Sequence, residues 1–126
     1  MDGEEKNSIL LSVKKLLGIA PDYTHFDLDL IMHINSVFLI LAQLGVGPDV
    51  PFQISGPEEL WTDFISEDKV PMVKSYMGLR VRKLFDPPLS GATMNAIDDQ
   101  IDEFEWRMNV FVETPPFKEE VEEDGG

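Results

Sequence analysis

The residues of this chain with the clearest capacity for chemistry are the carboxylates of the segment IDDQIDE, namely Asp98, Asp99, Asp102 and Glu103. On a helix, Asp98 and Asp102 lie one turn apart on the same side, where two carboxylates can share a cation. A hydrolytic pair instead needs one carboxyl group removed from water, because desolvation raises the pKa of a general acid. A carboxylate metal site needs acids that face inward from neighbouring helices. The helical period turns these acids away from the apolar residues of their segment, so we expect a solvated face.

The two histidines make no stronger case for chemistry. His25 and His33 are eight residues apart, whereas two imidazoles that share a metal on one helix are typically about four residues apart. The chain has no cysteine, which excludes thiolate catalysis, disulfides and cysteine zinc sites. It also has no phosphate-binding loop, nucleophile elbow or dinucleotide fingerprint. We therefore predict that the protein is not an enzyme and has no catalytic residue, cofactor or metal.

Length and composition indicate one acidic globular domain. A chain of 126 residues with 43% hydrophobic residues can bury a single core. It has no apolar run long enough to span a bilayer and no signal segment, so we expect a soluble protein made in the cytoplasm, without a membrane partner. The net charge of −14 opposes nonspecific binding to DNA or RNA.

Basic and acidic residues are separated into two neighbouring segments of helical pattern. The first carries Lys69, Lys74, Arg80, Arg82 and Lys83, and the second carries Asp98, Asp99, Asp102, Glu103 and Glu105. Three partners are open to Arg80, Arg82 and Lys83: the acids of the following helix, an acidic neighbouring subunit, or DNA in a channel. Five bases without interleaved glycine and aromatic residues are a weak nucleic-acid signal in so acidic a chain. The pattern favours subunit contacts.

Hydrophobic periodicity predicts an all-α fold, a small domain of four helices. The first helix begins at a cap, Asn7 or Ser8, and the second opens with Thr24 and Asp27 as an approximate capping box. A glycine ends each of the two helices. Their apolar stripes are Ile9, Val13, Leu16 and Leu17 in the first helix, and Leu30, Ile34, Val37, Leu41 and Leu44 in the second.

The third and fourth helices are predicted on either side of a Pro-Pro break. The third starts near Asp68, carries Pro71 in its first turn and runs to Phe85. It is apolar around most of its circumference, so it is either central in the fold or covered on assembly. Ser90 caps the fourth helix. The expected core stripes are Val70, Val73, Met77, Val81 and Leu84 in the third, and Met94, Ile97, Ile101, Phe104, Met108 and Phe111 in the fourth.

The segment 46–66 between the second and third helices is predicted to be a long irregular loop. Its glycines and prolines exclude a continuous helix, and the alternation around Phe52 and Ile54 allows a short β hairpin. Loops of this length in a compact domain are usually functional or ordered by a partner. Trp61 and Phe64 are therefore candidate contact residues.

Trp106 is the residue that is hardest to explain as part of a core. With Phe104 facing inward, the 3.6-residue period directs Trp106 outward, on the same side as Asp99 and Asp102. An outward tryptophan rimmed by charge is typical of an interface anchor. The alternative is that the long loop or the C-terminal tail covers it within the same chain.

The predicted organisation has three parts. Residues 1–7 form a flexible N-terminus, residues 8–112 form the helical domain, and residues 113–126 form a flexible acidic tail. The candidate interface residues are Trp61, Phe64, Arg80, Arg82, Lys83, Asp99, Asp102 and Trp106.

The order of several short segments resembles a known family. HINSVF with LGVGP, then VRKLFDPP, then IDEFEWR, are similar to segments of the small head–tail connector proteins of tailed bacteriophages. The resemblance covers roughly residues 8–112, and none of the segments is a catalytic motif. The acidic tail lies beyond the pattern, so the resemblance assigns it no role.

The resemblance implies a helical adaptor that assembles as a ring beneath the portal vertex and joins the capsid to the tail. It implies as partners further copies of the chain in twelve-fold symmetry, the portal protein, and the tail or head-closure proteins. DNA would pass through the ring without sequence-specific binding. It also implies a place in the virion after synthesis in the bacterial host. On this basis Arg80, Arg82 and Lys83 lie near subunit interfaces.

A second function remains open from the residues alone. A small acidic protein can act as an inhibitor that mimics DNA and occupies a basic site on a partner. A mimic needs its acids on one continuous exposed surface, whereas a ring subunit needs them matched by bases on an opposing face. The basic segment 69–83 favours the ring subunit.

Overall fold

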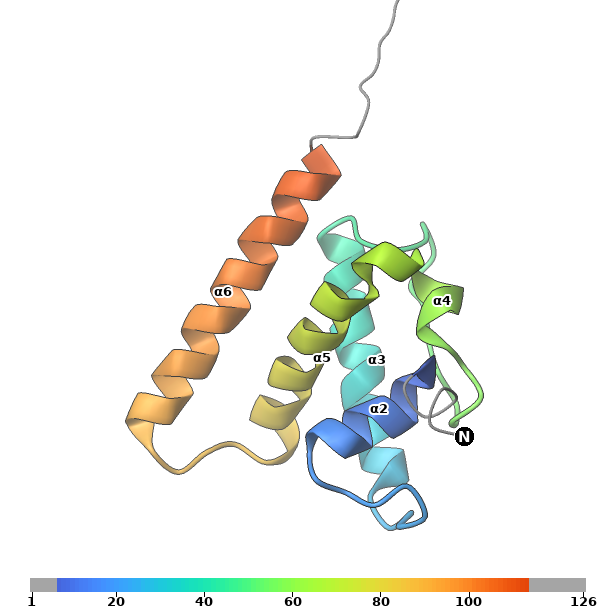
Figure 1. Ribbon diagram of the computed structural model, residues 1–126, viewed down its shortest axis with the longest axis vertical. Helices are drawn as coiled ribbons and strands as arrows, with labels where there is room; N and C mark the ends of the chain where they lie inside the picture. Colours follow the sequence, from blue (N-terminus) through green and yellow to red (C-terminus); the bar gives the residue numbers. More distant parts are fainter. Residues whose placement is uncertain (1–6, 114–126) are drawn as a thin grey trace, which may run out of the picture.

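The computed structural model describes residues 7–113, which form a helical domain (Figure 1). Its elements are α2 (Ile9–Leu16), α3 (Asp27–Gln43), α4 (Trp61–Phe64), the 3-10 helix η1 (Glu67–Lys69), α5 (Val70–Phe85) and α6 (Gly91–Glu113). The four longer helices are those expected from periodicity, so the all-α prediction is confirmed. Within residues 7–113 the hairpin considered for the long loop does not form, and Ser8 and Leu60 make one isolated bridge. The predicted flexible ends, residues 1–7 and 113–126, lie outside the described range except for Asn7 and Glu113, and Glu113 is the last residue of α6.

Helix α2 begins where the sequence predicts a cap. The Ser8 hydroxyl accepts a hydrogen bond from the Leu11 amide at 3.3 Å and donates one to the Pro57 carbonyl at 2.8 Å. The cap therefore satisfies an amide of the first turn and also ties the helix to the long loop. Gly18 follows the helix with a φ of 79°, a left-handed conformation that glycine adopts without steric cost.

Helix α3 begins differently from the prediction. Phe26 is its N-cap residue and makes no side-chain capping bond, so the expected capping box of Thr24 and Asp27 is wrong. The Asp27 carboxylate instead lies 2.9 Å from the ammonium of Lys14, a side chain only 1% exposed. A buried ammonium needs a compensating charge, and this need outweighs the local cap.

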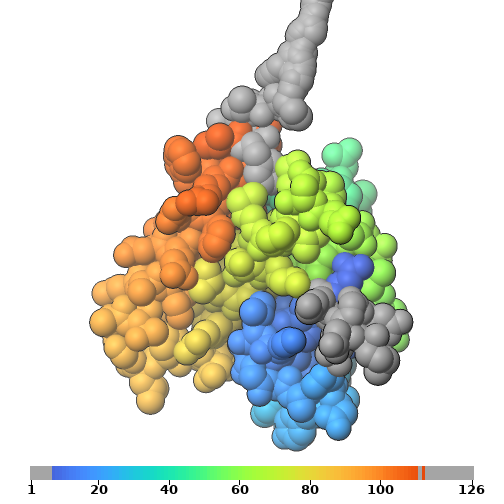
Figure 2. Space-filling model, in the orientation of Figure 1, coloured from blue at the N-terminus to red at the C-terminus, as the bar shows by residue number. Residues whose placement is uncertain are grey.

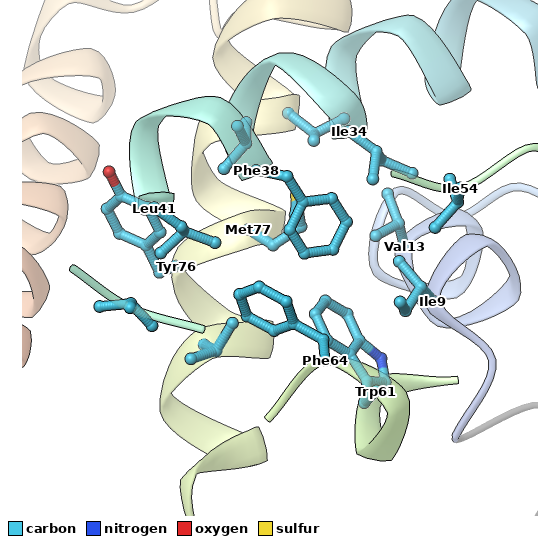
Figure 3. Packing of buried hydrophobic residues seen from close by; sticks show 14 of the residues in the cluster. Ile9, Val13, Ile34, Phe38, Leu41, Ile54, Trp61, Phe64, Tyr76 and Met77 are labelled. Carbon is cyan, nitrogen blue, oxygen red and sulfur yellow. The ribbon is translucent and has the colours of Figure 1, made fainter. Parts of the chain in front are cut away.

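Aromatic rings fill the core between α3, α4 and α5 (Figure 3). The ring of Phe38 lies 4.7 Å from that of Phe64 and 6.4 Å from that of Trp61, measured between centroids. The indole Nε1–H of Trp61 donates a hydrogen bond of 2.8 Å to the Ser12 hydroxyl. A tryptophan can be buried at little polar cost when its N–H finds such a partner. Trp61 therefore joins α4 to α2.

The long loop is held by contacts within the chain. The side-chain amide of Asn35 donates to the Ile54 carbonyl at 3.0 Å, and its oxygen accepts from the Ile54 amide at 2.8 Å. Gly47, with a φ of 94°, passes so close to Phe64 that a Cβ at this position would overlap the ring. The fold itself therefore orders this loop, and no partner is needed for that purpose.

Helix α5 is the central element of the domain. It packs against α2, α3, α4 and α6, as Figure 1 shows for the longer helices. This central position explains why the helix is apolar around most of its circumference. Of the two alternatives that the sequence left open, the one in which the helix is central in the fold is confirmed. Val73, Met77 and Val81 are buried as predicted, but Leu84 is 53% exposed. The next residue, Phe85, packs instead on Phe26 with ring centroids 5.1 Å apart.

Helix α6 is the most peripheral long helix and makes its main contact with α5. Ser90 caps it as predicted, since the Thr93 amide donates to its hydroxyl at 3.4 Å and the Met94 amide to its carbonyl at 3.0 Å. The buried side chains that face α5 include Ile97, Ile101 and Met108. A helix that packs on one neighbour leaves its other faces exposed to solvent.

Candidate interaction site

Charged residues of α5 and α6 meet in a compact network at the contact between the two helices. The Tyr76 hydroxyl donates to Glu105 Oε2 at 2.7 Å and accepts from Arg80 Nε at 2.8 Å. The Arg80 guanidinium also reaches the same carboxylate oxygen at 2.5 Å. Figure 3 shows the Tyr76 hydroxyl at the edge of the core, on the side of α6. The three side chains satisfy one another and fix α6 on α5.

The network shifts the acidity of its members. Burial and the hydrogen bond to Glu105 raise the pKa of Tyr76 well above its usual value. Burial alone would raise the pKa of Glu105, but the hydrogen bonds from Arg80 and Tyr76 outweigh it and the pKa is lowered. Burial alone would lower the pKa of Arg80, but the hydrogen bonds that it donates to Glu105 and Tyr76 outweigh burial and raise the pKa. All three groups therefore keep their ordinary neutral-pH charge states, which suits a structural link.

A second ion pair joins the helices near the other end of their contact. Lys83 Nζ lies 2.6 Å from Asp98 Oδ1, with both side chains partly exposed. Arg80 and Lys83 are thus committed to partners inside the chain, which matches the simplest of the three alternatives for the basic residues. Their further role at a subunit interface stays a prediction.

Trp61 and Phe64 do not lie on the surface. Trp61 is fully buried and Phe64 is 5% exposed, so the prediction that they are contact residues is wrong for this conformation. The physical reason is the one-turn helix α4, which turns both rings inward against Phe38. The sequence shows the aromatic residues but does not show the direction that this short turn gives them.

Trp106 faces solvent as the helical period predicts. It is 67% exposed and Val110, one turn later, is 41% exposed. Asp99 and Asp102 are exposed on the same face of α6 and form no ion pair or hydrogen bond with residues 7–113. The exposure also shows that the long loop leaves Trp106 uncovered. We call Asp99, Asp102, Trp106 and Val110 the tryptophan face.

A groove that the sequence did not reveal lies between α2, α5 and α6. Figure 2 shows the hollow between the blue α2 and the orange α6, over the yellow α5. Its volume is ≈ 510 Å³, within the range of about 300–1,000 Å³ that is usual for binding pockets. It is lined by Leu16, Leu17, Ser75, Gly78, Leu79, Arg82, Gln100, Glu103, Phe104 and Arg107.

The lining of the groove is mainly apolar and also contains basic side chains. Leucines and a phenylalanine supply the apolar part, and Leu16, expected in the core, is 54% exposed. Arg82 is exposed and makes no ion pair or hydrogen bond with the described part of the chain. Glu103, in contrast, is paired with Arg107 at 2.6 Å. The available charge in the groove is therefore positive.

One sequence signal could have indicated the groove. Gly78 lies inside a helix, where glycine costs about 1 kcal/mol relative to alanine, and such a residue usually has a packing reason. A Cβ at this position would lie 2.8 Å from Leu16 Cδ1. The glycine therefore leaves room for the end of the Leu16 side chain beside α5.

A further exposed apolar stripe was also missed on α3. Leu28, Met32 and Leu39 are each more than half exposed, and their spacing places them on one side of the helix. The same helix buries its other side in the core, so periodicity alone drew attention to only one of its two apolar faces.

Two other kinds of site were sought in the described range. Residues 7–113 contain no cluster of three or more potential metal ligands. None of the helices in this range is long and apolar enough to cross a membrane.

The comparisons with known proteins give one match. Residues 9–115 match a family model described as phage connector protein. The curated proteins and the solved structures yield no match.

Proposed function

The chain belongs to the phage connector protein family, which gives it a role in head–tail connection, and we propose that it acts by forming a ring beneath the portal vertex. The single observation that carries this proposal is the family match over residues 9–115. In the ring, the partners are further copies of the chain and the phage proteins on either side. A connector of this kind is a structural virion component, which favours a non-enzymatic role.

The distribution of exposed groups supports assembly through unlike surfaces. Neighbours in a ring meet head to tail, so each subunit must present two different and complementary patches. The tryptophan face of α6 is acidic and apolar, whereas the groove beside Arg82 is apolar and basic. Of the residues predicted for the interface, Arg82, Asp99, Asp102 and Trp106 remain the strongest candidates, since Arg80 and Lys83 already have partners within the chain.

The proposed ring adopts the twelve-fold symmetry of the portal and encloses part of the DNA conduit. A chain with a net charge of −14 repels the phosphate backbone. Such repulsion keeps DNA from adhering to the wall as it passes. The tail and head-closure proteins are the partners proposed for the opposite side of the ring.

The division of the chain is part of the same proposal. The helical domain of residues 8–112 is the connector body, and the acidic segment 113–126 is a tail that the body carries. The alternative function, an acidic inhibitor that mimics DNA, has no observation that favours it over the family assignment.

Binding to portal-containing capsids tests the proposal. Purified full-length chain is mixed with capsids that carry the portal but lack connectors, and bound chain is counted after sedimentation. We expect saturable binding at a fixed number of copies per portal vertex. Light scattering of the free chain supplies its mass before binding. Absence of binding to portal-containing capsids would refute the connector proposal.

A further inference from the structure

The tryptophan face and the groove are two exposed features of the described chain that its internal contacts leave unexplained. An exposed tryptophan is a large apolar surface in water, and an apolar surface rimmed by charge commonly marks a contact site. Tryptophan is also among the residues that contribute most to binding at interfaces. The groove offers what such a side chain needs, namely a concave apolar lining.

Trp106 cannot enter the groove of its own subunit. Glu103, Phe104 and Arg107 line the groove on α6. Trp106 lies beside them on the helix, but its side chain is 67% exposed and is not part of the lining. Any contact between the tryptophan face and the groove must therefore join two molecules.

The charges of the two surfaces are complementary. Asp99 and Asp102 flank Trp106 and form no ion pair with residues 7–113, and Arg82 at the groove is likewise without an ionic partner in that range. Removing a lone charge from water is unfavourable, and an opposite charge on the incoming surface offsets it. Glu103 does not oppose the approach because Arg107 is already paired with it.

We propose that the groove between α2, α5 and α6 receives Trp106 of a second copy of this chain, with Arg82 facing Asp99 or Asp102 of that copy. Because the two surfaces differ, the contact is heterologous and each subunit can both donate and receive. Repetition of the contact closes a ring or continues as a filament. This inference rests on the proposed function, in which copies of the chain stand side by side.

The charge pattern favours Trp106 of a second copy, rather than the α3 stripe, as the surface that enters the groove. The stripe of Leu28, Met32 and Leu39 has only the exposed Asp29 beside it, at its N-terminal end, whereas two acids without partners in the described range accompany Trp106. Val110 extends the apolar surface beyond Trp106 by one turn. An occupant with an aromatic side chain and two nearby acids matches the lining better than a purely aliphatic one.

Crosslinking of full-length subunits bound to portal-containing capsids tests the contact. The chain has no native cysteine, so introduced thiols react alone. Ser75→Cys marks the groove and Val110→Cys marks the tryptophan face without removing Trp106. With a short bis-maleimide, the double variant should give a ladder of covalent oligomers, and a mixture of the two single variants should give dimers. Each single variant by itself should stay monomeric on a denaturing gel.

Two further double variants test whether another part of a second copy lies in the groove instead of Trp106. Ser75→Cys with Met32→Cys places the second thiol on the α3 stripe, and Ser75→Cys with Val121→Cys places it in the C-terminal segment. A ladder from either of these, without one from the Ser75 and Val110 pair, would overturn the proposal. Dimers from Val110→Cys alone would also overturn it, because they indicate a symmetric contact.

The outcome also separates this inference from the proposed function. Subunits that bind capsids but give no Ser75–Val110 product would refute the contact and leave the connector role intact. If the subunits do not bind capsids, the same crosslinking is carried out with concentrated free chain. A ladder there supports the contact without the connector role, and its absence rejects both.

A groove-filling substitution provides a second measurement. Ser75→Phe adds a ring in the groove at an exposed position, and Ser36→Phe adds the same ring at an exposed position of α3. We expect Ser75→Phe and Trp106→Ala each to weaken capsid binding at least about ten-fold, with unchanged helical circular dichroism. Ser36→Phe should bind as the parent chain does. Equal binding by all three variants would contradict the proposed contact.

Discussion

At the scale of single residues, the two tryptophans show how position on an element determines role. Trp61 is fully buried and its Nε1–H is satisfied by Ser12, whereas Trp106 is 67% exposed on α6. The first therefore contributes to stability through burial of a large apolar surface. The second buries little surface in the isolated chain and is available for the contact proposed above.

Truncation of each tryptophan to alanine separates the two roles. Trp61→Ala should lower the free energy of unfolding by about 3–5 kcal/mol, because it leaves a cavity and removes the hydrogen bond that Ser12 Oγ accepts from the indole. Trp106→Ala should change it by no more than about 0.5 kcal/mol, as for other exposed positions. Urea denaturation followed by circular dichroism measures both. A large loss of stability in Trp106→Ala would show that it belongs to the core.

The buried ammonium of Lys14 is a second example of a residue whose role depends on its position in the fold. It donates to the Pro21 carbonyl at 3.0 Å and lies 2.9 Å from the Asp27 carboxylate. Although Asp27 Oδ1 is close to the ammonium, it is not aligned for a hydrogen bond. The link is therefore chiefly ionic, and it fixes the turn between α2 and α3.

At the scale of elements, α6 depends on α5 for its position. The apolar contacts along Ile97, Ile101 and Met108 are supplemented by the Arg80–Glu105 and Lys83–Asp98 pairs. The Pro87-Pro88 sequence separates the two helices so that α6 can fold back as a distinct element (Figure 1). The strength of this helix pair determines whether the tryptophan face is held in a defined orientation.

The lowered pKa of Glu105 predicts an acid-sensitive component of stability. A carboxyl group whose pKa is depressed by folding stabilises the fold above its unfolded pKa of about 4.5. This stabilisation is lost as the pH falls through the folded value. Glu105→Gln should therefore reduce the free energy of unfolding at pH 7, by about 1–2 kcal/mol given the partial exposure of the site.

The difference between the parent chain and Glu105→Gln should shrink when the pH is lowered from 7 to 3. Urea denaturation at several pH values measures it, and the comparison of two chains removes the effects of other acids such as Glu59 and Asp68, whose pKa values are also lowered. Asp102→Gln, an exposed position of the same helix, serves as control. A difference that stayed constant with pH would show that the effect is one of packing.

At the scale of the whole molecule, the net charge disfavours association of subunits, whereas the complementary charges at the proposed contact favour it. A charge of −14 on every copy repels neighbouring subunits, while the proposed contact between Arg82 and an aspartate attracts them. Repulsion between whole subunits acts over about 10 Å at 0.1 M salt and over about 3 Å at 1 M. One ion pair is a small attraction against a repulsion of this size, so the apolar contact of Trp106 must carry most of the association.

Salt should therefore promote association of the free chain. We expect the weight-average mass of concentrated protein, measured by sedimentation equilibrium, to rise between about 0.02 and about 0.5 M sodium chloride, a range over which the Debye length shortens several-fold. Trp106→Ala should show little rise, since it retains the charge but lacks the apolar contact. A mass that fell with salt would indicate that charge pairs dominate the contact.

The sequence by itself determined the four long helices and the outward direction of Trp106. Both follow from local physics, because a 3.6-residue period, a cap such as Ser8 and a break such as Pro87-Pro88 act within one segment. The order of short motifs also pointed to the connector family, which the family match confirms. These features require no knowledge of how the segments pack.

Only the tertiary structure decided which side chains remain free for a partner. It placed Trp61 and Phe64 in the core, paired Arg80 and Lys83 with acids of α6, and moved Asp27 from a cap to Lys14. It also created the groove, whose lining comes from three helices. The physical reason is that burial, ion pairing and concavity depend on residues distant in the sequence, which periodicity within one helix cannot relate.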